Sequence, residues 1–203
     1  MSDATLVFAT RNPGKLREVR ALLSALPVRV LPLDDAVQVA LPEEGDDYAD
    51  NAAAKARAAA LASGWAALGD DSGLEVDALA GAPGARSARL GTSDAERNER
   101  LLAALAGVPP ERRGARFVCV AALAMPGASA LKVAIARGEC AGRILAAPRG
   151  AGGFGYDPLF EPSEAAARGR SFAELPAAEK DRLSHRGRAF RALLPAIEAY
   201  LRS

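Results

Sequence analysis

The first third of the chain alternates between continuous apolar runs and apolar positions with helical spacing. The run from Thr5 to Thr10 is typical of a buried strand, and Val28 to Leu31 predicts a second one. Between them, Lys15 to Leu26 carries apolar residues three and four positions apart, which predicts an amphipathic helix. Strand, helix and strand in this order indicate a βαβ unit, and therefore a parallel sheet with helices on its faces.

The next segment continues the mixed pattern. An acidic loop, Pro42 to Asp47, precedes an alanine-rich stretch, Tyr48 to Ser63, which predicts a helix ended by Gly64. Short apolar runs at Trp65 to Leu68 and Leu74 to Leu79 predict two extended segments.

The middle of the chain predicts a helix followed by paired strands. Ser93 to Glu96 matches a capping box, so a helix should begin there and run to Leu105. Arg116 to Met125 and Leu131 to Arg137 predict strands of an antiparallel hairpin, which turns at Pro126 to Ser129.

The last quarter predicts one more strand, a long loop and two helices. Gly142 to Ala146 is the strand, and the glycine-rich stretch Pro148 to Pro162 is long enough to suggest a functional loop. Helices are expected over Pro176 to Leu183 and Arg186 to Leu201, with Ser184 as the N-cap of the second. We therefore expect an α/β fold with a central mixed β-sheet flanked by helices.

Composition narrows the class of protein. The chain has 203 residues, half of them apolar, which suits one domain spanning residues 1–203. A net charge of +1 gives no overall field to recruit nucleic acid or a membrane surface, so we expect neither as a partner. Cys119 and Cys140 are too few for a disulfide framework, and the apolar run at the N-terminus is too short for a signal peptide. These features predict a soluble cytoplasmic protein.

The four residues Asp70 to Gly73, which follow the predicted extended segment Trp65 to Leu68, suit a metal or a reactive water. Asp70-Asp71-Ser72-Gly73 follows Leu68, and hard cations such as Mg²⁺ prefer carboxylate oxygens. Glu43 and Glu44, in the acidic loop, could supply a second carboxylate to a metal held by Asp71. The alternative is an ordinary acidic turn, because Asp, Ser and Gly all favour turns.

Two basic segments are candidates for binding phosphate. The loop Thr10-Arg11-Asn12-Pro13-Gly14-Lys15 lies between a predicted strand and a predicted helix, where backbone amides and a lysine attract anions. Its spacing is too short for a Walker loop. Asn51 and Lys55 are four residues apart and share one helix face. A tight turn and a solvated lysine remain open as alternatives.

The loop Gly150 to Gly155 fits G-x-G-x-x-G literally, but the flanking prolines oppose the strand and helix of a dinucleotide site. We interpret it as a loop that brings Phe154 and Asp157 to a flat base, which the ring stacks and the carboxylate hydrogen-bonds. Lys180, His185 and Arg186 cluster near the junction of the last helices and could donate to carbonyl oxygens on that base, although a lone histidine is more often structural.

Six short motifs occur in order along nearly the whole chain. They are Thr10-Arg-Asn-Pro-Gly-Lys15, Asp50-Asn-Ala-Ala-Ala-Lys55-Ala, Asp70-Asp-Ser-Gly73, Gly81-Ala-Pro-Gly-Ala-Arg-Ser-Ala-Arg89, Gly152-Gly-Phe-Gly-Tyr-Asp-Pro158 and Ser184-His-Arg-Gly187. In this order they resemble the inosine triphosphate pyrophosphatases, also called XTP/dITP diphosphatases. The chain departs from that family's first motif, because Arg11 stands where the family usually has glycine.

The resemblance implies an elongated two-lobed α/β fold with a nucleotide cleft between the lobes, a homodimer, and dependence on Mg²⁺. The implied reaction is hydrolysis of dITP, ITP or XTP at the α–β linkage, which gives the monophosphate and pyrophosphate. Asp71 would be the general base and, with Glu43, a metal ligand. Ser72 would touch the nucleotide, and Arg89 is a weaker candidate for the phosphates. The other substrate-binding residues implied are Thr10, Arg11, Asn12, Pro13, Gly14, Lys15, Lys55, Phe154, Gly155, Tyr156, Asp157, Lys180, His185 and Arg186.

Two other functions use some of the same residues. A nucleotide-binding regulatory protein would need the phosphate and base sites but no convergence of Glu43 and Asp71 on a metal. An NAD(P)-linked oxidoreductase would need Gly150 to Gly155 as its dinucleotide loop, which the flanking prolines disfavour.

Overall fold

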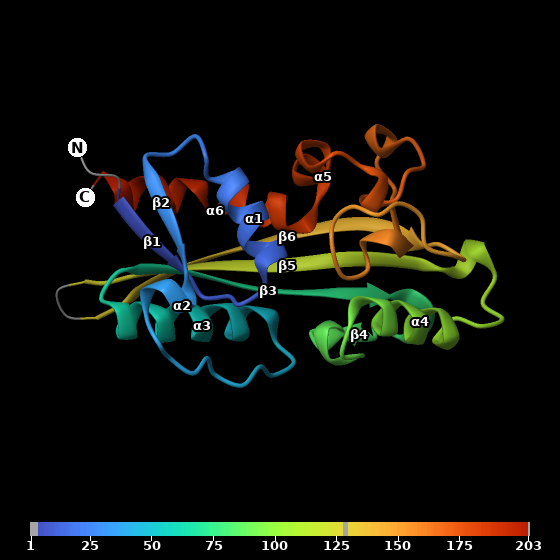
Figure 1. Ribbon diagram of the computed structural model, residues 1–203, viewed down its shortest axis with the longest axis horizontal. Coiled ribbons are helices and arrows are strands. Elements are labelled where there is room, and N and C mark those ends of the chain that lie inside the picture. The colour runs from blue at the N-terminus through green and yellow to red at the C-terminus, as the bar shows by residue number, and fades with distance from the viewer. Residues whose placement is uncertain (1–3, 128–129, 203) are drawn as a thin grey trace. The chain divides into compact units, whose positions relative to one another are not determined.

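The computed structural model describes residues 4–127 and 130–202, and it shows a mixed β-sheet with helices packed on it (Figure 1). The strands are β1 (Ala4–Phe8), β2 (Val28–Pro32), β3 (Ala66–Val76), β4 (Pro83–Gly84), β5 (Gly114–Met125), β6 (Lys132–Ile144) and β7 (Phe160–Pro162). The α-helices are α1 (Pro13–Leu22), α2 (Leu33–Ala36), α3 (Tyr48–Ser63), α4 (Asp94–Ala104), α5 (Ala177–Leu183) and α6 (His185–Leu201). Among the described residues, no helix is long and apolar enough to cross a membrane.

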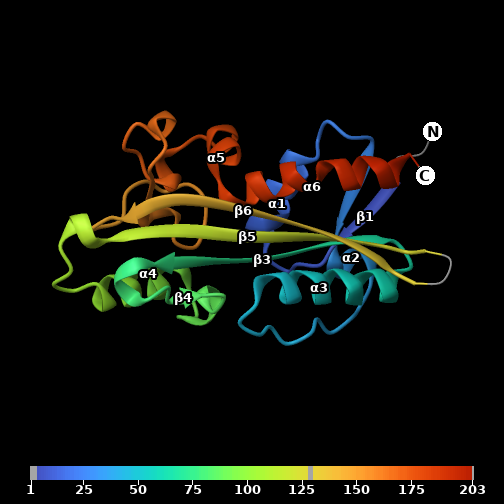
Figure 2. The same cartoon turned by 180° about the vertical axis from the view of Figure 1, so that it is seen from behind.

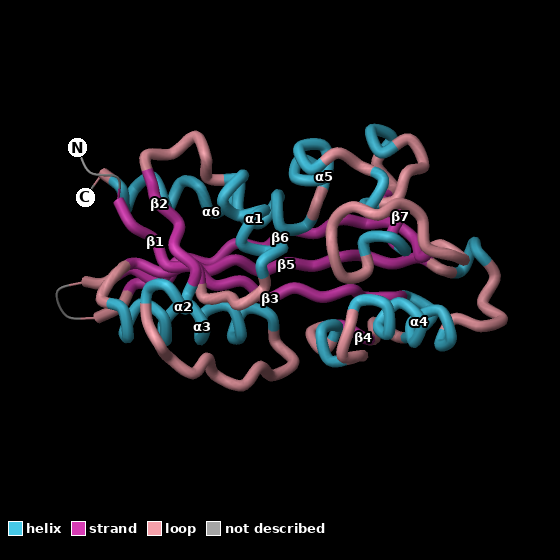
Figure 3. The backbone as a smooth tube through the Cα atoms, in the orientation of Figure 1, coloured by secondary structure: helices cyan, strands magenta, loops and turns pink. Residues whose placement is uncertain are grey.

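The sheet combines parallel and antiparallel pairs. Its order is β2-β1-β3-β5-β6-β7, with β4 paired to β3. Strand β1 runs parallel to β2 and β3, so that Val7 lies opposite Leu31 on one side and Ala67 on the other. Strand β7 runs antiparallel beside β6, with Phe160 opposite Ile144 (Figure 3). The predicted α/β fold with a mixed sheet is therefore confirmed.

The chain divides into two compact units, each assembled from separate stretches of sequence. Unit 1 comprises Met1–Asp71, Cys119–Gly138 and Arg186–Ser203, and unit 2 comprises Ser72–Val118 and Glu139–His185. Strands β3, β5 and β6 each contribute one part to unit 1 and the other part to unit 2. The nucleotide cleft implied by the resemblance stays a prediction.

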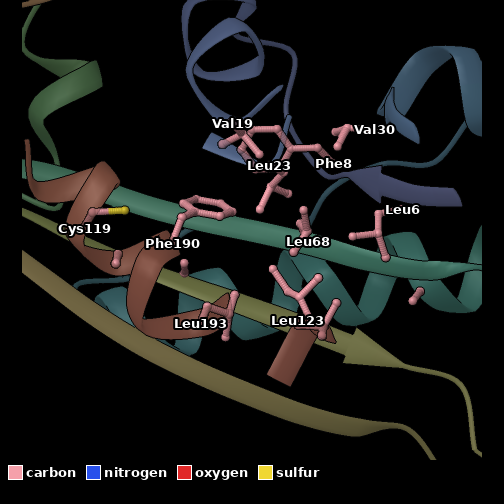
Figure 4. Close-up of a cluster of buried hydrophobic side chains, with 14 residues drawn as sticks. Leu6, Phe8, Val19, Leu23, Val30, Leu68, Cys119, Leu123, Phe190 and Leu193 are labelled. Carbon is pink, nitrogen blue, oxygen red and sulfur yellow. The ribbon is translucent and has the colours of Figure 1, made fainter. Parts of the chain in front are cut away.

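The core of unit 1 lies between the sheet and helices α1 and α6, and Figure 4 shows its side chains. Phe8 of β1 meets Phe190 of α6 edge to face, with ring centroids 6.0 Å apart. Ala66 and Leu68 of β3 belong to this cluster. Because successive side chains of a strand point to opposite faces, the intervening residues of β3 point to the other face of the sheet.

Helix α3 covers that other face, and both views of the ribbon show it opposite α6 (Figures 1 and 2). Alanines line its buried side, which lets the helix approach the sheet closely. The approach is closest at Gly69 of β3, where a Cβ atom would stand 2.3 Å from the Ala52 carbonyl oxygen. A glycine is therefore required immediately before the aspartate pair, because a side chain there would push α3 away.

The core of unit 2 is built around aromatic rings. Phe117 of β5 packs against Phe160 with ring centroids 4.7 Å apart, and Phe160 packs against Phe172 at 5.0 Å. Leu101 of α4 and Tyr156 join the same buried cluster. These contacts anchor the C-terminal end of the 148–162 loop, whose 3₁₀ turn at Asp157–Leu159 leads directly into β7.

Strand β3 differs from the sequence prediction. We expected a break after Leu68, with Asp70 to Gly73 in a loop, but the strand is continuous through all four residues. Two buried carboxylates are tolerated in a strand because lysine, arginine and amide side chains from the flanking helices pair with them. Strand β6 is likewise one strand where two had been expected, over Leu131 to Arg137 and Gly142 to Ala146.

Most other segments agree with prediction. Helix α3 spans the predicted Tyr48–Ser63 and ends at Gly64, whose φ of 75° is the left-handed conformation that glycine adopts easily. Helix α1 ends at Leu22 rather than Leu26, because Pro27 disfavours helical backbone in the residue before it. Strands β5 and β6 are neighbours as predicted, although residues 128 and 129 of the predicted turn lie outside the described residues.

Candidate active site

Alternation along β3 separates the two adjacent aspartates of unit 1. Asp70 shares the face of Ala66 and Leu68, towards α1 and α6, whereas Asp71 shares the face of Gly69, towards α3. Both carboxylates are buried, with 1% and 3% of the residue exposed. Asp70 and Asp71 are adjacent in sequence, but they contact different partners.

Asp70 is the centre of a buried charge network. Lys15 of α1 donates to Oδ1 at 3.0 Å, and Arg186 of α6 donates through Nε to Oδ2 at 3.1 Å. Arg186 also donates through Nη1 to Glu18 at 2.5 Å, and the Cys119 thiol lies 4.0 Å from Oδ2. Burial opposes the charge of Asp70, but Lys15 and Arg186 outweigh it and hold the pKa of this carboxyl well below its ordinary value.

Asp71 has the opposite electrostatic balance. Its Oδ2 accepts a hydrogen bond from Asn51 Nδ2 at 2.8 Å, and its Oδ1 lies 3.4 Å from Lys55 Nζ. Burial raises the pKa of Asp71, and Lys55 and Asn51 only partly offset that effect. A carboxylate with a raised pKa is a better proton acceptor than an ordinary aspartate, which is the property a general base needs.

Helix α3 supplies both partners of Asp71. Asn51 and Lys55 are one helical turn apart, and both are buried, as the motif spacing had suggested. Lys55 also pairs with Glu44 from the preceding loop. Burial lowers the pKa of Lys55, but Asp70, Asp71 and Glu44 outweigh burial, so its pKa is raised and the ammonium stays charged.

The loop before α1 is an internally bonded turn. The Asn12 side chain caps the helix by accepting from the amides of Gly14 at 2.8 Å and Lys15 at 3.1 Å. Asn12 N itself donates to Thr10 Oγ1, and Pro13 has no amide hydrogen. We had expected these amides to cradle phosphate, but several of them already donate within the loop. The positive helix end and the Lys15 ammonium remain as attractions for an anion.

Arg11 is exposed and turns towards the segment after β2. Its Nε donates to Asp34 at 3.2 Å, and its Nη2 donates to the Val39 carbonyl oxygen at 3.2 Å. Among the described residues other than glycine, only Ala80 and Arg168 have a positive φ, so the arginine at this motif position requires no left-handed backbone. The side chain that replaces the family's glycine thus ties the loop to residues 34–39, and its predicted contact with substrate stays a prediction.

The predicted metal ligands are arranged differently from expectation. Glu43 is exposed, and it is Glu44 that reaches the Lys55 ammonium beside Asp71. Within residues 4–127 and 130–202, no group of three histidine, cysteine or acidic side chains could hold a metal ion. Two carboxylates fit a magnesium ion that takes its remaining ligands from phosphate oxygens and water, which is how Mg²⁺ is usually bound beside nucleotides.

In unit 2, the predicted base-binding loop is held by a buried ion pair. The Asp157 carboxylate accepts from the Phe154 amide at 2.8 Å and pairs with Lys180 of α5. The Lys180 ammonium lies 4.9 Å from the centroid of the half-buried Phe154 ring. Gly153 has a φ of 71°, and a Cβ there would stand 2.0 Å from Asp157 Oδ2, so the turn requires glycine. Phe154 and Asp157 thus lie together as expected, and Lys180, which the sequence had grouped with His185 and Arg186, joins them.

Three further residues assigned to the base have other partners. Tyr156 is buried, its hydroxyl donates to the Ser87 carbonyl oxygen at 2.8 Å, and burial raises its pKa to about 12. His185 is buried and stacks on Phe117 with ring centroids 4.5 Å apart. Arg186 belongs to the Asp70 network of unit 1. Their side chains are committed to the protein interior, and a role in base contact stays a prediction.

The remaining candidates are less constrained. Ser72 is half-buried on β3 directly after Asp71, and Arg89 is exposed in a short 3₁₀ turn. The loop Gly150 to Gly155 has neither a strand immediately before it nor an α-helix opening within it, so it lacks the context of a dinucleotide-binding site.

Sequence reasoning missed Glu18, Asp94 and Asn98. Glu18 is the second carboxylate on Arg186, and the other two residues contact the Gly155 peptide from α4. Asn98 carried a usable signal, since it is a polar residue on the apolar stripe of a helix, three positions before the buried Leu101. Asp94 carried none, because an acidic residue in the first turn of a helix is ordinary.

A mixed sheet that buries two carboxylates among lysine and arginine side chains, one carboxyl with a lowered and one with a raised pKa, defines an α/β protein with an electrostatic arrangement typical of an enzyme active site. The sequence profile of the Ham1 family matches residues 6–196. The chain therefore belongs to the Ham1 family.

Relatives and solved structures cover nearly the whole chain. The dITP/XTP pyrophosphatase of Gloeobacter violaceus is 53% identical over 191 residues, which cover 93% of this chain and 92% of the relative. The dITP/XTP pyrophosphatase of Frankia alni is 50% identical over 208 residues, covering 98% and 99%. A HAM1 protein from Coxiella burnetii superposes with a TM-score of 0.82 at 38% identity, covering 97% of this chain and 99% of that one.

Proposed function

We propose that this chain is a nucleoside-triphosphate pyrophosphatase that hydrolyses dITP, XTP and ITP to the monophosphate and pyrophosphate. The relatives named dITP/XTP pyrophosphatase support the reaction and the substrate class. The observation that carries the mechanism is the buried Asp71, whose pKa is raised and whose orientation is held by Asn51.

Asp71 acts as the general base. It takes a proton from the water that attacks the α-phosphorus, and the bond to the β-phosphate oxygen breaks. The Asn51 amide fixes one carboxylate oxygen by a 2.8 Å hydrogen bond, which orients the other for the water. Because the pKa of Asp71 is raised, the proton transfer is more favourable than to an exposed aspartate.

Lysines neutralise the pyrophosphate leaving group. Lys55 stays charged in its buried position because carboxylates surround it, and Lys15 is held by Asp70 at the start of α1. The charge on the departing phosphates is stabilised by cations that are already fixed in place, which is the main requirement of phosphoryl chemistry.

A magnesium ion bound at this site would polarise the phosphate oxygens and neutralise part of the developing charge. Asp71 would be one ligand. Glu43 is the second ligand that the resemblance implies, and Glu44 is the carboxylate that the structure brings to Lys55. The two glutamates can be distinguished by measuring pyrophosphate release at increasing Mg²⁺ concentrations in Glu43→Gln and in Glu44→Gln. The half-saturating Mg²⁺ concentration should rise in the variant that has lost the metal ligand and stay at the wild-type value in the other.

Unit 2 selects the base. Phe154 stacks it, and Lys180 with Asp157 reads its edge, since the three side chains form one cluster. Inosine and xanthosine carry an oxygen at position 6 where adenosine carries an amino group. A cationic donor therefore favours the former and leaves the latter with two opposed donors, which gives strong rejection.

The test is to incubate the protein with Mg²⁺ and dITP, XTP, ITP, GTP or ATP and to measure pyrophosphate. Release from the first three only is the expected result. Binding of dITP without release would favour a regulatory nucleotide-binding protein, and equal turnover of ATP would refute the base assignment.

The resemblance also suggests a single catalytic domain over residues 1–203 that works as a homodimer in the cytoplasm. Light scattering coupled to size-exclusion chromatography measures the mass directly, and a mass of one chain across the working concentration range would contradict the dimer.

A further inference from the structure

Both backbone groups of Gly155, in the middle of the proposed base-binding loop, are hydrogen-bonded by side chains of helix α4. The Gly155 amide donates to Asp94 Oδ2 at 2.7 Å, and the Gly155 carbonyl oxygen accepts from Asn98 Nδ2 at 3.1 Å. Asp94 and Asn98 are four residues apart, so they project from the same face of α4. All of these residues belong to unit 2.

The conformation of Gly155 explains why such a clamp is needed. Its φ of 63° is left-handed, and a Cβ atom there would meet nothing within 4 Å. The space on the Cβ side of Gly155 is therefore open, and glycine has the widest backbone freedom of any residue. The two side-chain hydrogen bonds from α4 restrict that freedom.

The clamp itself is rigidly supported. Ser93 caps α4 by accepting from the Glu96 amide, and Arg97 pairs with the second oxygen of Asp94. Partial burial opposes ionisation of Asp94, but the hydrogen bond from Gly155 and the contacts with Arg97 outweigh it and lower the pKa of the carboxyl. Asn98 is 8% exposed, so its hydrogen bond is shielded from water.

The residues on either side of Gly155 carry the proposed base recognition. Phe154 precedes Gly155, and its amide donates a hydrogen bond to the Asp157 carboxylate, which also forms an ion pair with Lys180. Tyr156 follows it and is anchored through its hydroxyl to the Ser87 backbone. With Tyr156 fixed on one side, the backbone dihedral angles of Gly155 set the direction in which the chain leads to Phe154.

We propose that Asp94 and Asn98 are positioning residues for base selection, which hold the Gly155 peptide so that Phe154 and the Asp157–Lys180 pair face the nucleobase. The inference rests on the proposed function of the loop. It also implies that the Gly155 amide hydrogen, which already bonds Asp94, is not available to the base.

The kinetic test compares Asp94→Ala, Asn98→Ala and Asp94→Asn with Glu99→Ala. Glu99 is exposed on the same helix, so its loss matches the charge change without touching the loop. Loss of a charge-assisted hydrogen bond predicts a fall of about 10-fold or more in kcat/KM for dITP with Asp94→Ala, carried by KM. Asp94→Asn keeps an oxygen acceptor for the Gly155 amide, so its kcat/KM for dITP should be close to the wild-type value.

Two readouts distinguish positioning from general damage. The preference for dITP over dATP should narrow in Asp94→Ala and Asn98→Ala, whereas inhibition by inorganic triphosphate, which has no base, should stay at the wild-type value. The inference would be overturned if kcat/KM for dITP and the inhibitory affinity of inorganic triphosphate fell by the same factor. It would also be overturned if kcat/KM fell while the preference for dITP over dATP stayed at the wild-type value.

Hydrogen exchange and monophosphate binding keep the test independent of turnover. Exchange in the peptide covering residues 150–157 should accelerate in Asp94→Ala and Asn98→Ala but not in Glu99→Ala, and the affinity for inosine monophosphate should fall in parallel. If the wild-type protein releases no pyrophosphate, the proposed reaction fails, and these two measurements still judge the clamp. Unaltered exchange with unaltered affinity would refute it.

Discussion

The two adjacent aspartates of β3 should respond in opposite ways to the same substitution. Asp70 is 1% exposed and accepts from Lys15 at 3.0 Å and Arg186 at 3.1 Å. Removing one partner of a buried ion pair costs about 3–5 kcal/mol. In Asp70→Asn the amide oxygen still accepts a hydrogen bond, so we expect the lower end, about 3 kcal/mol, or a fall of about 6–12 °C in Tm for a chain of this length.

Asp71→Asn should not lower the Tm, because burial disfavours the charge of Asp71 and the neutral amide removes that penalty. Its kcat for pyrophosphate release should fall by about 10²- to 10⁴-fold, the usual contribution of a general base. Differential scanning calorimetry at neutral pH gives the two Tm values, and the pyrophosphate assay gives the two rates.

The pH dependence follows from the two pKa directions. The pKa of Asp70 is lowered in the folded state, so its stabilisation is present above the unfolded pKa and is lost as the pH falls below it. The pKa of Asp71 is raised, so its ionised form opposes folding at neutral pH and acid relieves that cost. The deficit of Asp70→Asn relative to wild type should therefore shrink on acidification. Equal Tm losses in the two variants would refute the argument from strand alternation, and full turnover in Asp71→Asn would refute the base assignment.

Two further substitutions test the packing around these sites. Gly69→Ala places a Cβ 2.3 Å from the Ala52 carbonyl oxygen, and we expect a loss of about 1–3 kcal/mol by urea unfolding together with reduced kcat, because α3 carries the partners of Asp71. Tyr156→Phe removes the donor to the Ser87 carbonyl oxygen, which should cost about 1–3 kcal/mol by urea unfolding and, because it frees one flank of Gly155, narrow the preference for dITP over dATP. An unchanged preference would mean that the Tyr156 hydroxyl does not help to position the loop.

Local signals explain what the sequence could predict. Helix α3 was predicted from first to last residue because alanine favours helices and because Gly64 ends the helix in the left-handed conformation that glycine adopts easily. Phe154 and Asp157 were paired because a loop rich in glycine carried an aromatic ring and a carboxylate, whereas the contact of Lys180 with Asp157, 23 residues away, left no local signal.

The continuity of β3 could not be predicted, because a buried strand containing two aspartates is unfavourable until its partners are known. Those partners are remote, with Lys15 at a separation of 55 residues and Arg186 at 116. The same distance hid the ion pairs of Arg186 with Asp70 and Glu18, while its assignment to the base stays a prediction. The hydrophobic pattern of a sequence indicates the periodicity of helices and strands, but it does not indicate which charged side chains from distant segments form ion pairs.

Assembly of unit 1 from three separate stretches has a consequence for synthesis on the ribosome. Arg186, Phe190 and Leu193 are made after the other two stretches of unit 1, yet they complete the ion network and the core begun by the first strands. Until α6 leaves the exit tunnel, Asp70 can pair with Lys15 but lacks Arg186, and α1 alone can cover the apolar face of β1 and β3, so part of this core stays exposed during synthesis. The charge network around Asp70 therefore closes only after α6 has been made, although its other members belong to the first two stretches of unit 1.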